Sequence, residues 1–248
     1  MVQPLFFTAS ARTLTLGQIY VLAGEEGKHA ATVKRLRVGE QLQLTDGTGI
    51  RVGAKVLQNL GSSLELEVSE IREETLPELQ LTLVQALAKG DRDELAVQAA
   101  TELGVSGVVP WQANRCVSKW EGPKLAKGVA RWRLIIAEAA KQSLRVHTPK
   151  VQDSVSTLQL AESVKTYDQV LVLDPTAKTS LKSAIPKVGH VAIVVGPEGG
   201  IDGSELELLE NSGAIRVHLG RGILRTSTAG LAAISAILAF GSAWDSAE

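Results

Sequence analysis

Two glycine-rich stretches near the C-terminal end of the sequence carry residue types suited to a ligand site. The first, GPEGG at 196–200, follows an apolar run at 191–195, and the second, GRG at 220–222, follows a run at 214–219. Glycines between a strand and a helix let the backbone approach a ligand closely. A phosphate loop would also need a lysine, whereas the first stretch carries Glu198 and no lysine. The pattern favours a ligand with hydroxyl or ammonium donors, such as an adenosine with an amino-acid tail. A tight turn ahead of a capped helix is the alternative interpretation.

A parallel sheet with helices on both faces is the α/β fold class that we expect to position these loops. After residue 78, apolar runs typical of strands alternate with helical patterns, which is the signature of such a sheet. Ligands of open parallel sheets bind where strands end, and a third run ends at Asp174. We expect strands at 79–87, 105–110, 170–173, 191–195 and 214–219 and helices at 91–103, 124–145, 202–211 and 228–240.

Two of these helices carry more specific signals. Asp91 and Glu94 have the spacing of a capping box at the start of the first helix, and Gly104 follows its end. The last helix contains AGLAAISAILAF at 229–240, which is apolar nearly all round. Such a helix is predicted to be buried on every side.

The first 72 residues show a different pattern, that of a small β-rich domain. Short apolar or alternating runs at 19–22, 41–45, 52–57 and 64–68 predict strands, and 24–37 predicts a helix. The segment REETLPE at the domain boundary is charged, contains a proline and lacks periodicity. The predicted organisation is therefore a domain at 1–72, a linker at 73–78 and a second domain at 79–248.

Composition excludes several classes of protein. Cys116 is the single cysteine among 248 residues, and none of the four histidines forms a close pair, so neither a disulfide framework nor a metal site is expected. A reducing cytoplasm is the expected compartment. The N-terminus lacks a basic start followed by a long apolar run, so we expect no secretory signal. The apolar segment 229–240 is shorter than the roughly 20 residues that span a bilayer.

Basic residues gather in two places although the net charge is only −1. Between Arg115 and Lys150 nine lysines and arginines face two acids, and a smaller cluster holds Lys28, His29, Lys34, Arg35 and Arg37. Solvated helix faces would explain either cluster alone. Two clusters together favour a polyanionic partner such as RNA.

Several sequence blocks, in order along the chain, resemble one family. GPEGGIDGSELE and HLGRGILRTSTAG resemble the ribosomal RNA small subunit methyltransferase E family, which methylates N3 of a uridine in 16S rRNA. The resemblance continues in QALAKGDRDELAVQAATELGV, VVPWQANRCVSKW, RWRLIIAEAAKQSLRVHTPKV and HAATVKRLRVGEQLQLTDGTG. Together these blocks cover most of residues 29–230.

The resemblance implies a fold, a cofactor and partners. It implies a PUA-like N-terminal domain for RNA, and a C-terminal SPOUT domain whose chain forms a deep trefoil knot. It also implies a homodimer, and as substrate either 16S rRNA or the assembled small ribosomal subunit. The implied cofactor is S-adenosylmethionine, without a metal. By position its contacts are Leu173, Gly196, Pro197, Glu198, Gly199, Gly200, Leu219, Gly220, Ile223, Leu224 and Thr226. Ordinary core packing is the alternative role for each aliphatic residue among them.

The reaction implied is transfer of a methyl group from a sulfonium to a ring nitrogen. Loss of the N3 proton spreads negative charge onto O2 and O4 of the uracil, which a nearby cation would stabilise. Arg225 is the candidate for this catalytic role, and a structural or phosphate-positioning arginine is the alternative. Glu198 could accept a proton, but cofactor binding is its preferred role. Ser227 stands where the family often has glutamate, so we assign no general base.

RNA contacts follow from the same resemblance and from the basic clusters. N3 lies on the Watson–Crick edge, so the target uridine must be unpaired or extruded. Leu5 stands where an arginine would be more usual, which weakens the N-terminal contact. The candidate RNA-binding residues are His29, Lys34, Arg35, Arg37, Lys89, Arg92, Arg115 and Arg145.

Two other functions remain open from the sequence. One is an RNA-binding relative of the same fold that has lost catalysis, which Ser227 supports. The other is a knotted methyltransferase that acts on transfer RNA or on a ribose hydroxyl. The N-terminal β-rich domain and the KGDRDE and NRCVSK blocks favour the ribosomal RNA enzyme over it.

Overall fold

The computed structural model describes residues 2–241 and 244, and these form two compact units. Unit 1 comprises residues 1–76 and 140–148, and unit 2 comprises residues 77–139 and 149–248. The sequence-based division does not include 140–148 in the N-terminal domain. Backbone hydrogen bonds explain the difference, since Thr148 N donates to Gly47 O at 2.9 Å and Gly49 N donates to Val146 O at 2.9 Å. Pairing over such a distance in sequence leaves no local signature.

Unit 1 is built on a five-stranded sheet in the order β1-β3-β4-β5-β2. The β1–β3 pair is parallel and the other pairs are antiparallel. Alternate residues of β4 are buried, so one face of the sheet forms the core of the unit. The strands are β1 (Leu5–Phe7), β2 (Ile19–Leu22), β3 (Gln41–Thr45), β4 (Ile50–Asn59) and β5 (Leu64–Glu73).

The helix predicted at 24–37 is shorter than expected. It consists of α1 (Gly24–Lys28) and a π-helical turn at His29–Val33. Arg35 adopts a left-handed conformation with φ +54°, which stops the helix, and the Leu36 N–H donates to Ala30 O at 3.1 Å.

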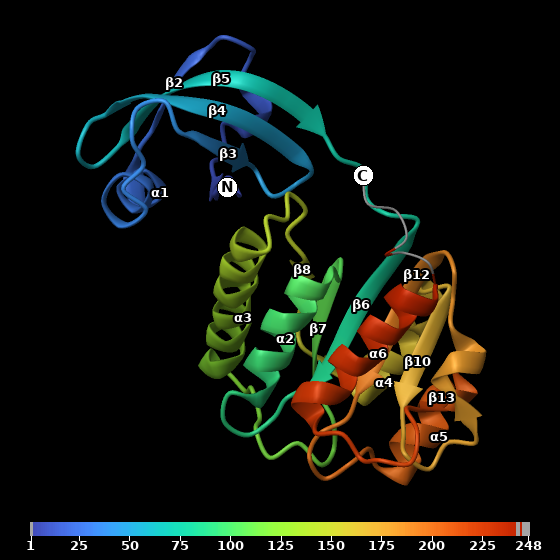
Figure 1. Ribbon diagram of the computed structural model, residues 1–248. Coiled ribbons are helices and arrows are strands. Elements are labelled where there is room, and N and C mark those ends of the chain that lie inside the picture. Colours follow the sequence, from blue (N-terminus) through green and yellow to red (C-terminus); the bar gives the residue numbers. More distant parts are fainter. Residues whose placement is uncertain (1, 242–243, 245–248) are drawn as a thin grey trace. The chain divides into compact units, whose positions relative to one another are not determined.

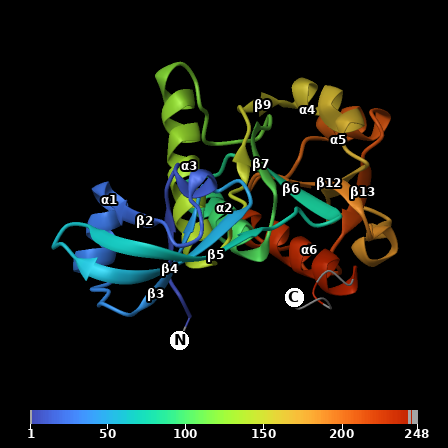
Figure 2. The ribbon, with the colours of Figure 1, turned by 90° about the horizontal axis from the view of Figure 1, so that it is seen from above.

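Unit 2 contains a parallel sheet covered by helices, as the sequence predicts. The strand order is β11-β13-β10-β12-β6-β7-β8, with β9 paired to β7, and every pairing is parallel. Helices α2 and α6 lie on one face and α4 and α5 on the other (Figures 1 and 2). The strands are β6 (Leu79–Ala86), β7 (Gly107–Gln112), β8 (Lys150–Val151), β9 (Val155–Ser156), β10 (Gln169–Leu173), β11 (Thr179–Ser180), β12 (Gly189–Val195) and β13 (Ile215–His218).

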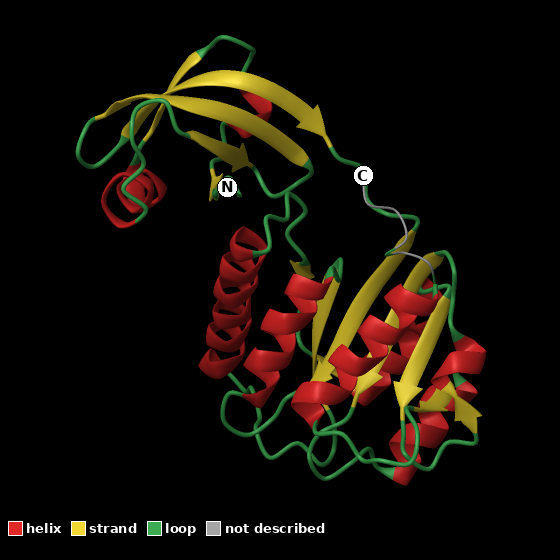
Figure 3. Cartoon of the chain, viewed as in Figure 1, coloured by secondary structure: helices red, strands yellow, loops and turns green. Residues whose placement is uncertain are grey.

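α-Helices lie between many of these strands along the chain (Figure 3). They are α2 (Arg92–Leu103), α3 (Pro123–Gln142), α4 (Thr157–Ser163), α5 (Gly203–Asn211) and α6 (Thr226–Phe240). Helix α3 ends three residues before the predicted end because Leu144 takes a left-handed φ of +57°. Among residues 2–241 no helix combines the length and apolar character that a membrane span requires.

Two helix predictions are wrong in detail. Asp91 is the N-cap of α2, but its side chain makes no capping hydrogen bond. Glu94 instead pairs with Arg131 of α3 at 2.9 Å, so the expected capping box does not form. Gly104 ends the helix with φ +108°, as predicted.

Helix α6 is not buried on every side within the single chain. One stripe is buried against α2 and the sheet, while the side chain of Phe240 is 66% exposed. The apolar character of the remaining sides therefore has no explanation in packing within the chain. The buried residues of α6 are Thr226, Gly230, Ala233, Ile234, Ile237 and Leu238, and the partly exposed ones include Leu231, Ala232 and Ala236.

Candidate active site

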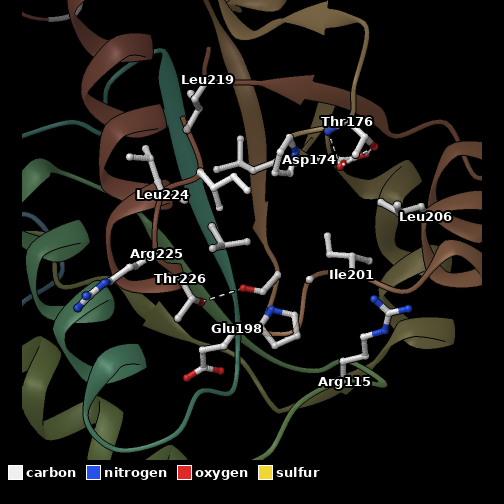
Figure 4. A pocket seen from close by; sticks show the side chains of 18 of the residues that line it. Arg115, Asp174, Thr176, Glu198, Ile201, Leu206, Leu219, Leu224, Arg225 and Thr226 are labelled. Carbon is white, nitrogen blue, oxygen red and sulfur yellow. Dashed lines mark hydrogen bonds between the residues drawn. The ribbon is translucent and has the colours of Figure 1, made fainter. Parts of the chain in front are cut away.

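A cavity of about 730 Å³ lies at the carboxyl ends of three neighbouring strands of unit 2 (Figure 4). The segments that follow β10, β12 and β13 form its wall, because parallel strands end at the same edge of the sheet. Most of the cofactor residues predicted from the sequence line it, namely Leu173, Gly196, Pro197, Glu198, Gly200, Leu219, Ile223, Leu224 and Thr226.

Two predicted cofactor residues do not line this cavity. Gly199 lies against Arg115, whose Nη1 donates to its carbonyl oxygen at 3.2 Å. Gly220 adopts φ +113°, and its N–H donates to His218 Nδ1 at 3.1 Å. Both glycines thus shape their loops without forming the wall. The cavity also includes residues that the sequence did not single out as cofactor contacts, namely Asp174, Pro175, Thr176, Val195, Ile201, Gly203, Leu206, Val217, Gly222 and Ala229.

The GPEGG loop is a tight turn that leads directly into α5. Gly200 N donates to Pro197 O at 2.9 Å, and Gly200 has φ +72°, a conformation that favours glycine. Asp202 is the N-cap of α5 and forms a reciprocal capping box with Glu205. Both the turn and the capped helix are therefore present, and they hold the loop at the cavity wall.

Glu205 is a buried carboxylate that the sequence analysis missed. It is 2% exposed, and its Oε1 accepts from Asn114 N at 2.8 Å and from Thr157 Oγ1 at 2.5 Å. These bonds tie the first turn of α5, which follows the GPEGG loop, to the segment after β7 and to the start of α4. The spacing of Asp202 and Glu205 is the sequence signal that could have revealed it.

Glu198 is engaged by the protein itself. Its Oε1 accepts from Lys89 N and from Arg92 Nη1, both at 3.1 Å. Burial by itself would raise the pKa of Glu198, but these hydrogen bonds outweigh it and keep the pKa below its usual value. Glu198 is therefore charged at neutral pH and fastens the loop before α2 to the cavity wall.

Asp174, at the end of β10, is held in a similar way. It is 7% exposed and accepts from Arg216 Nε at 2.8 Å and from Thr176 N at 2.9 Å. Burial would raise the pKa of Asp174, but the hydrogen bonds from Thr176 and Arg216 lower it overall. A second charged carboxylate is thus fixed at the wall.

Three arginines line the cavity, and only one of them has a free guanidinium within the described part of the chain. Arg92 is bound to Glu198, and Arg115 donates to Asp202 Oδ2 at 3.1 Å. Arg225, the predicted catalytic residue, is exposed and has no hydrogen bond or ion pair to another described side chain. In Figure 4 its side chain extends from the start of α6 away from the aliphatic side chains of the cavity.

Thr226 and Ser227 begin helix α6 after the second loop. Thr226 Oγ1 donates to Gly196 O at 2.9 Å and accepts from Gln85 Nε2 at 2.9 Å, so its single hydroxyl proton is used within the chain. Ser227 is partly exposed and does not cap the helix, because the N-cap position belongs to Arg225 and carries no side-chain cap.

The cavity suits a ligand with a flat apolar part and polar edges. Aliphatic side chains of Leu173, Leu219 and Leu224 line it, and backbone groups of two glycine-containing loops border it. Among the described residues no group of three or more histidine, cysteine, aspartate or glutamate side chains is arranged to hold a metal ion.

Most of the other predicted RNA-binding residues belong to unit 1, together with a small cavity of about 190 Å³. His29 and Lys34 line that cavity, and the His29 ring meets Phe6 edge-on at 5.9 Å between centroids. Lys34, Arg35 and Arg37 are exposed. Arg145 is only partly exposed, and burial lowers the pKa of its guanidinium to about 10. Lys89, in unit 2, is exposed.

Comparison with known proteins gives consistent matches over both units. The RNA methyltransferase domain family matches residues 75–238, and the RNA methyltransferase PUA domain family matches residues 22–59. The ribosomal RNA small subunit methyltransferase E of Mycobacterium bovis is 42% identical over 236 residues, which is 92% of this chain and 89% of the relative. That of Bacillus subtilis is 33% identical, with 95% of each chain covered.

Solved structures show the same similarity. The ribosomal RNA small subunit methyltransferase E of Neisseria gonorrhoeae, bound to S-adenosylmethionine, superimposes with a TM-score of 0.84 at 29% identity, covering 96% of this chain and 98% of the other. A methyltransferase from Legionella pneumophila, also in complex with S-adenosylmethionine, gives a TM-score of 0.85 at 30% identity, with the same coverage.

Proposed function

Because the chain belongs to the ribosomal RNA small subunit methyltransferase E family, we propose that it methylates N3 of one uridine in 16S rRNA. The chain is accordingly an enzyme that uses S-adenosylmethionine to methylate ribosomal RNA, and the atom and base are the proposed part. Its C-terminal unit has the SPOUT fold and its N-terminal unit the PUA-like fold. The trefoil knot stays a prediction from the family resemblance.

The observation that carries the proposal is the cavity where the Gly196 and Leu219 loops meet. Its volume of about 730 Å³ is sufficient for a nucleoside with an amino-acid tail, and its wall combines aliphatic side chains with glycine backbone. Asp174 and Glu198 place carboxylate oxygens at this wall, which can accept from hydroxyl or ammonium donors. The residues present therefore fit S-adenosylmethionine. We assign it to Leu173, Gly196, Pro197, Glu198, Gly200, Leu219, Ile223, Leu224 and Thr226, with Gly199 and Gly220 shaping the loops.

When bound, S-adenosylmethionine supplies a methyl group on a sulfonium, which is an excellent leaving system. The protein must then orient the uracil and stabilise negative charge on O2 and O4 as the N3 proton leaves. We assign that role to Arg225, since it is the cavity arginine whose guanidinium is not already held by a carboxylate of residues 2–241. No side chain is assigned as a base, because Ser227 occupies the position at which glutamate is usual.

Recognition of RNA is assigned to basic residues of both units. In unit 1 these are His29, Lys34, Arg35 and Arg37, and around the cavity of unit 2 they are Lys89, Arg92 and Arg115. Arg145 is a weaker candidate because it is partly buried. Exposed cations suit phosphates, whose contacts position RNA without reading its sequence. Since the substrate is 16S rRNA or the small subunit, the proposed activity belongs in the cytoplasm.

We further propose that the protein is a homodimer in which the exposed side of α6 is covered. Leu231, Ala232 and Ala236 on this side are only partly buried, and Phe240 at its end is 66% exposed. Apolar side chains that stay partly exposed on one side of a helix are typical of an interface. Sedimentation of the parental protein and of Leu231→Glu tests the proposal, and an unchanged monomer in both would contradict it.

Mass mapping of 16S rRNA after reaction with labelled S-adenosylmethionine tests the enzymatic proposal. Free rRNA and assembled small subunits are compared in parallel, and a methyl group on N3 of one uridine is the expected product. Methylation of a ribose hydroxyl, or of transfer RNA alone, would identify a different knotted methyltransferase. Calorimetric binding of the cofactor without transfer to either RNA would identify an inactive relative.

A further inference from the structure

Gln85 is a fully buried polar side chain at the end of β6. It is 0% exposed and stands next to the buried apolar residues Val84 and Ala86. Its Nε2 donates to Ala86 O at 3.1 Å and to Thr226 Oγ1 at 2.9 Å. A side chain on one strand is thus hydrogen-bonded to the first residue of a helix 141 positions later in the sequence.

The direction of these hydrogen bonds follows from the chemistry of the partners. Ala86 O can only accept, so the amide of Gln85 must present its nitrogen and not its oxygen at that point. The same nitrogen faces Thr226 Oγ1, which therefore accepts from Gln85. The single hydroxyl proton of Thr226 is then directed to Gly196 O, at 2.9 Å. The two hydrogen bonds thus form a series in which Gln85 donates to Thr226 and Thr226 donates to Gly196.

This series of hydrogen bonds joins the two loops that line the cofactor cavity. Gly196 opens the GPEGG loop after β12, and Thr226 closes the loop that follows β13. The two strands are not neighbours, because β10 lies between them. Among the hydrogen bonds of residues 2–241, the one from Thr226 to Gly196 directly connects these loops.

Gly230, one turn into α6, permits the close approach of this helix to the sheet that the hydrogen-bond series requires. A Cβ at Gly230 would lie 3.0 Å from Leu83 Cδ1 and 3.1 Å from Val195 Cγ2, which is tighter than ordinary contact. The start of α6 therefore packs directly on the ends of β6 and β12, and this places Thr226 within reach of both Gln85 and Gly196.

The acceptor of Gln85 has no partner within the described chain. Its Oε1 is buried and makes no hydrogen bond, which is unfavourable for stability. A side chain retained for stability alone would be better replaced by an apolar one of similar shape. The part of Gln85 that explains its presence is therefore the donor Nε2, which is hydrogen-bonded to Thr226.

We propose that Gln85 is a positioning residue for cofactor binding. By donating to Thr226 it directs the Thr226 proton to Gly196 and so holds the two cavity loops at the separation that S-adenosylmethionine requires. Gln85 does not line the cavity and acts only through Thr226. The inference rests on the proposed function for the identity of the ligand.

The test is calorimetric titration of S-adenosylmethionine into Gln85→Leu, Thr226→Val and the double variant. Each single variant is expected to weaken binding about 3- to 10-fold, the range of one net hydrogen bond. Because Gln85 acts only through Thr226, the double variant is expected to bind the cofactor no more weakly than Thr226→Val. Thr226→Ser, which keeps the hydroxyl, should retain parental affinity.

Gln169→Leu is the matched control. Gln169 begins β10 of the same sheet, and its Nε2 donates to Ala184 O at 2.9 Å, away from the cavity. This variant is expected to lower the unfolding temperature and leave cofactor affinity unchanged. In the transfer assay Gln85→Leu should raise the KM for cofactor and leave kcat at saturating cofactor near the parental value.

The proposal is overturned if Gln85→Leu binds the cofactor with parental affinity, or if Gln169→Leu loses as much affinity as Gln85→Leu. Additive losses in the double variant would also overturn it. Should Gln85→Leu fail to fold, the cofactor affinities of Thr226→Val and Thr226→Ser are compared instead. Equal affinities would refute the role of the Thr226 hydroxyl and with it the proposal. Failure of the parental protein to bind the cofactor would refute the proposed function instead.

Discussion

The cofactor cavity of unit 2 and the basic surface of unit 1 use charge in opposite ways. In the cavity wall the charged groups are paired, Glu198 with Arg92 and Asp202 with Arg115. On the basic surface of unit 1, formed by Lys28, His29, Lys34, Arg35 and Arg37, the lysines and arginines pair with no carboxylate of the described chain. A site with paired charges is preorganised for one ligand, whereas exposed cations attract any polyanion in a salt-dependent way.

Arg225 is the exception within the cavity, and its removal is expected to have the largest effect. Arg225→Ala should slow methyl transfer about 100-fold or more, since it removes a charge that acts on the developing anion. Cofactor affinity should stay near parental, because the aliphatic walls are unchanged. The measurement is incorporation of labelled methyl into 16S rRNA.

Arg221→Ala is the control for this comparison, because Arg221 is exposed in the same loop but does not line the cavity. It should transfer methyl groups at nearly the parental rate. If Arg225→Ala transferred methyl groups at the parental rate, Arg225 would have no catalytic role and would be equivalent to the exposed cations of unit 1.

The shape of the GPEGG loop is expected to matter next. Gly200 has φ +72°, and alanine in that conformation costs about 1–2 kcal/mol. The loop of Gly200→Ala is therefore expected to relax to another conformation, and restoring its shape on binding should weaken cofactor affinity about tenfold. Gly61→Ala, in the turn between β4 and β5, is the control. Gly61 has φ +90° and surroundings as open as those of Gly200, so alanine there meets a similar backbone strain. It should lower stability without changing cofactor affinity. Equal affinities in the two variants would show that the loop conformation does not shape the cavity.

The basic surface of unit 1 should show a smaller and salt-dependent effect. Lys34→Ala is expected to weaken RNA binding several-fold and to reduce the slope of log affinity against log salt by about 0.7, the value for one phosphate contact on a single strand. Cofactor binding should not change. Lys55→Ala, an exposed lysine on β4 outside the basic surface, is the control. If both variants gave the same salt slope, the surface would have no special role in binding RNA.

The smallest expected effect is on stability in acid. The folded-state pKa of Asp174 lies below its ordinary value of 3.8, so its contribution to unfolding free energy is complete above that value. The contribution is lost as the pH falls through the folded-state pKa. Asp174→Asn should therefore be less stable at neutral pH and show a shallower loss of unfolding temperature in acid. The exposed Asp153→Asn should follow the parental curve, and an Asp174→Asn curve parallel to the parental one would contradict the assignment.

Local patterns predicted much of the fold. The alternation of strands and helices after residue 78 predicted the parallel sheet, and the glycine-rich loops at 196–200 and 220–222 were expected at its carboxyl edge. Periodicity could not show which polar groups neutralise each other across the sheet. Glu94 was expected to cap α2 and instead binds Arg131, because the partner comes from another helix.

The residues of the sequence by themselves predicted two glycine-containing loops unsuited to phosphate, because glycine conformations and the absence of a lysine are local properties, and the family resemblance predicted the cofactor. Tertiary structure decided the rest. It assigned residues 140–148 to the first unit, connected Glu205 to Asn114 and Thr157, and used the Thr226 hydroxyl to join two loops. Within the described residues it also left Arg225 as the cavity arginine without a carboxylate partner. The physical reason is the same in each case, since hydrogen-bond partners distant in the chain meet only after the sheet has formed.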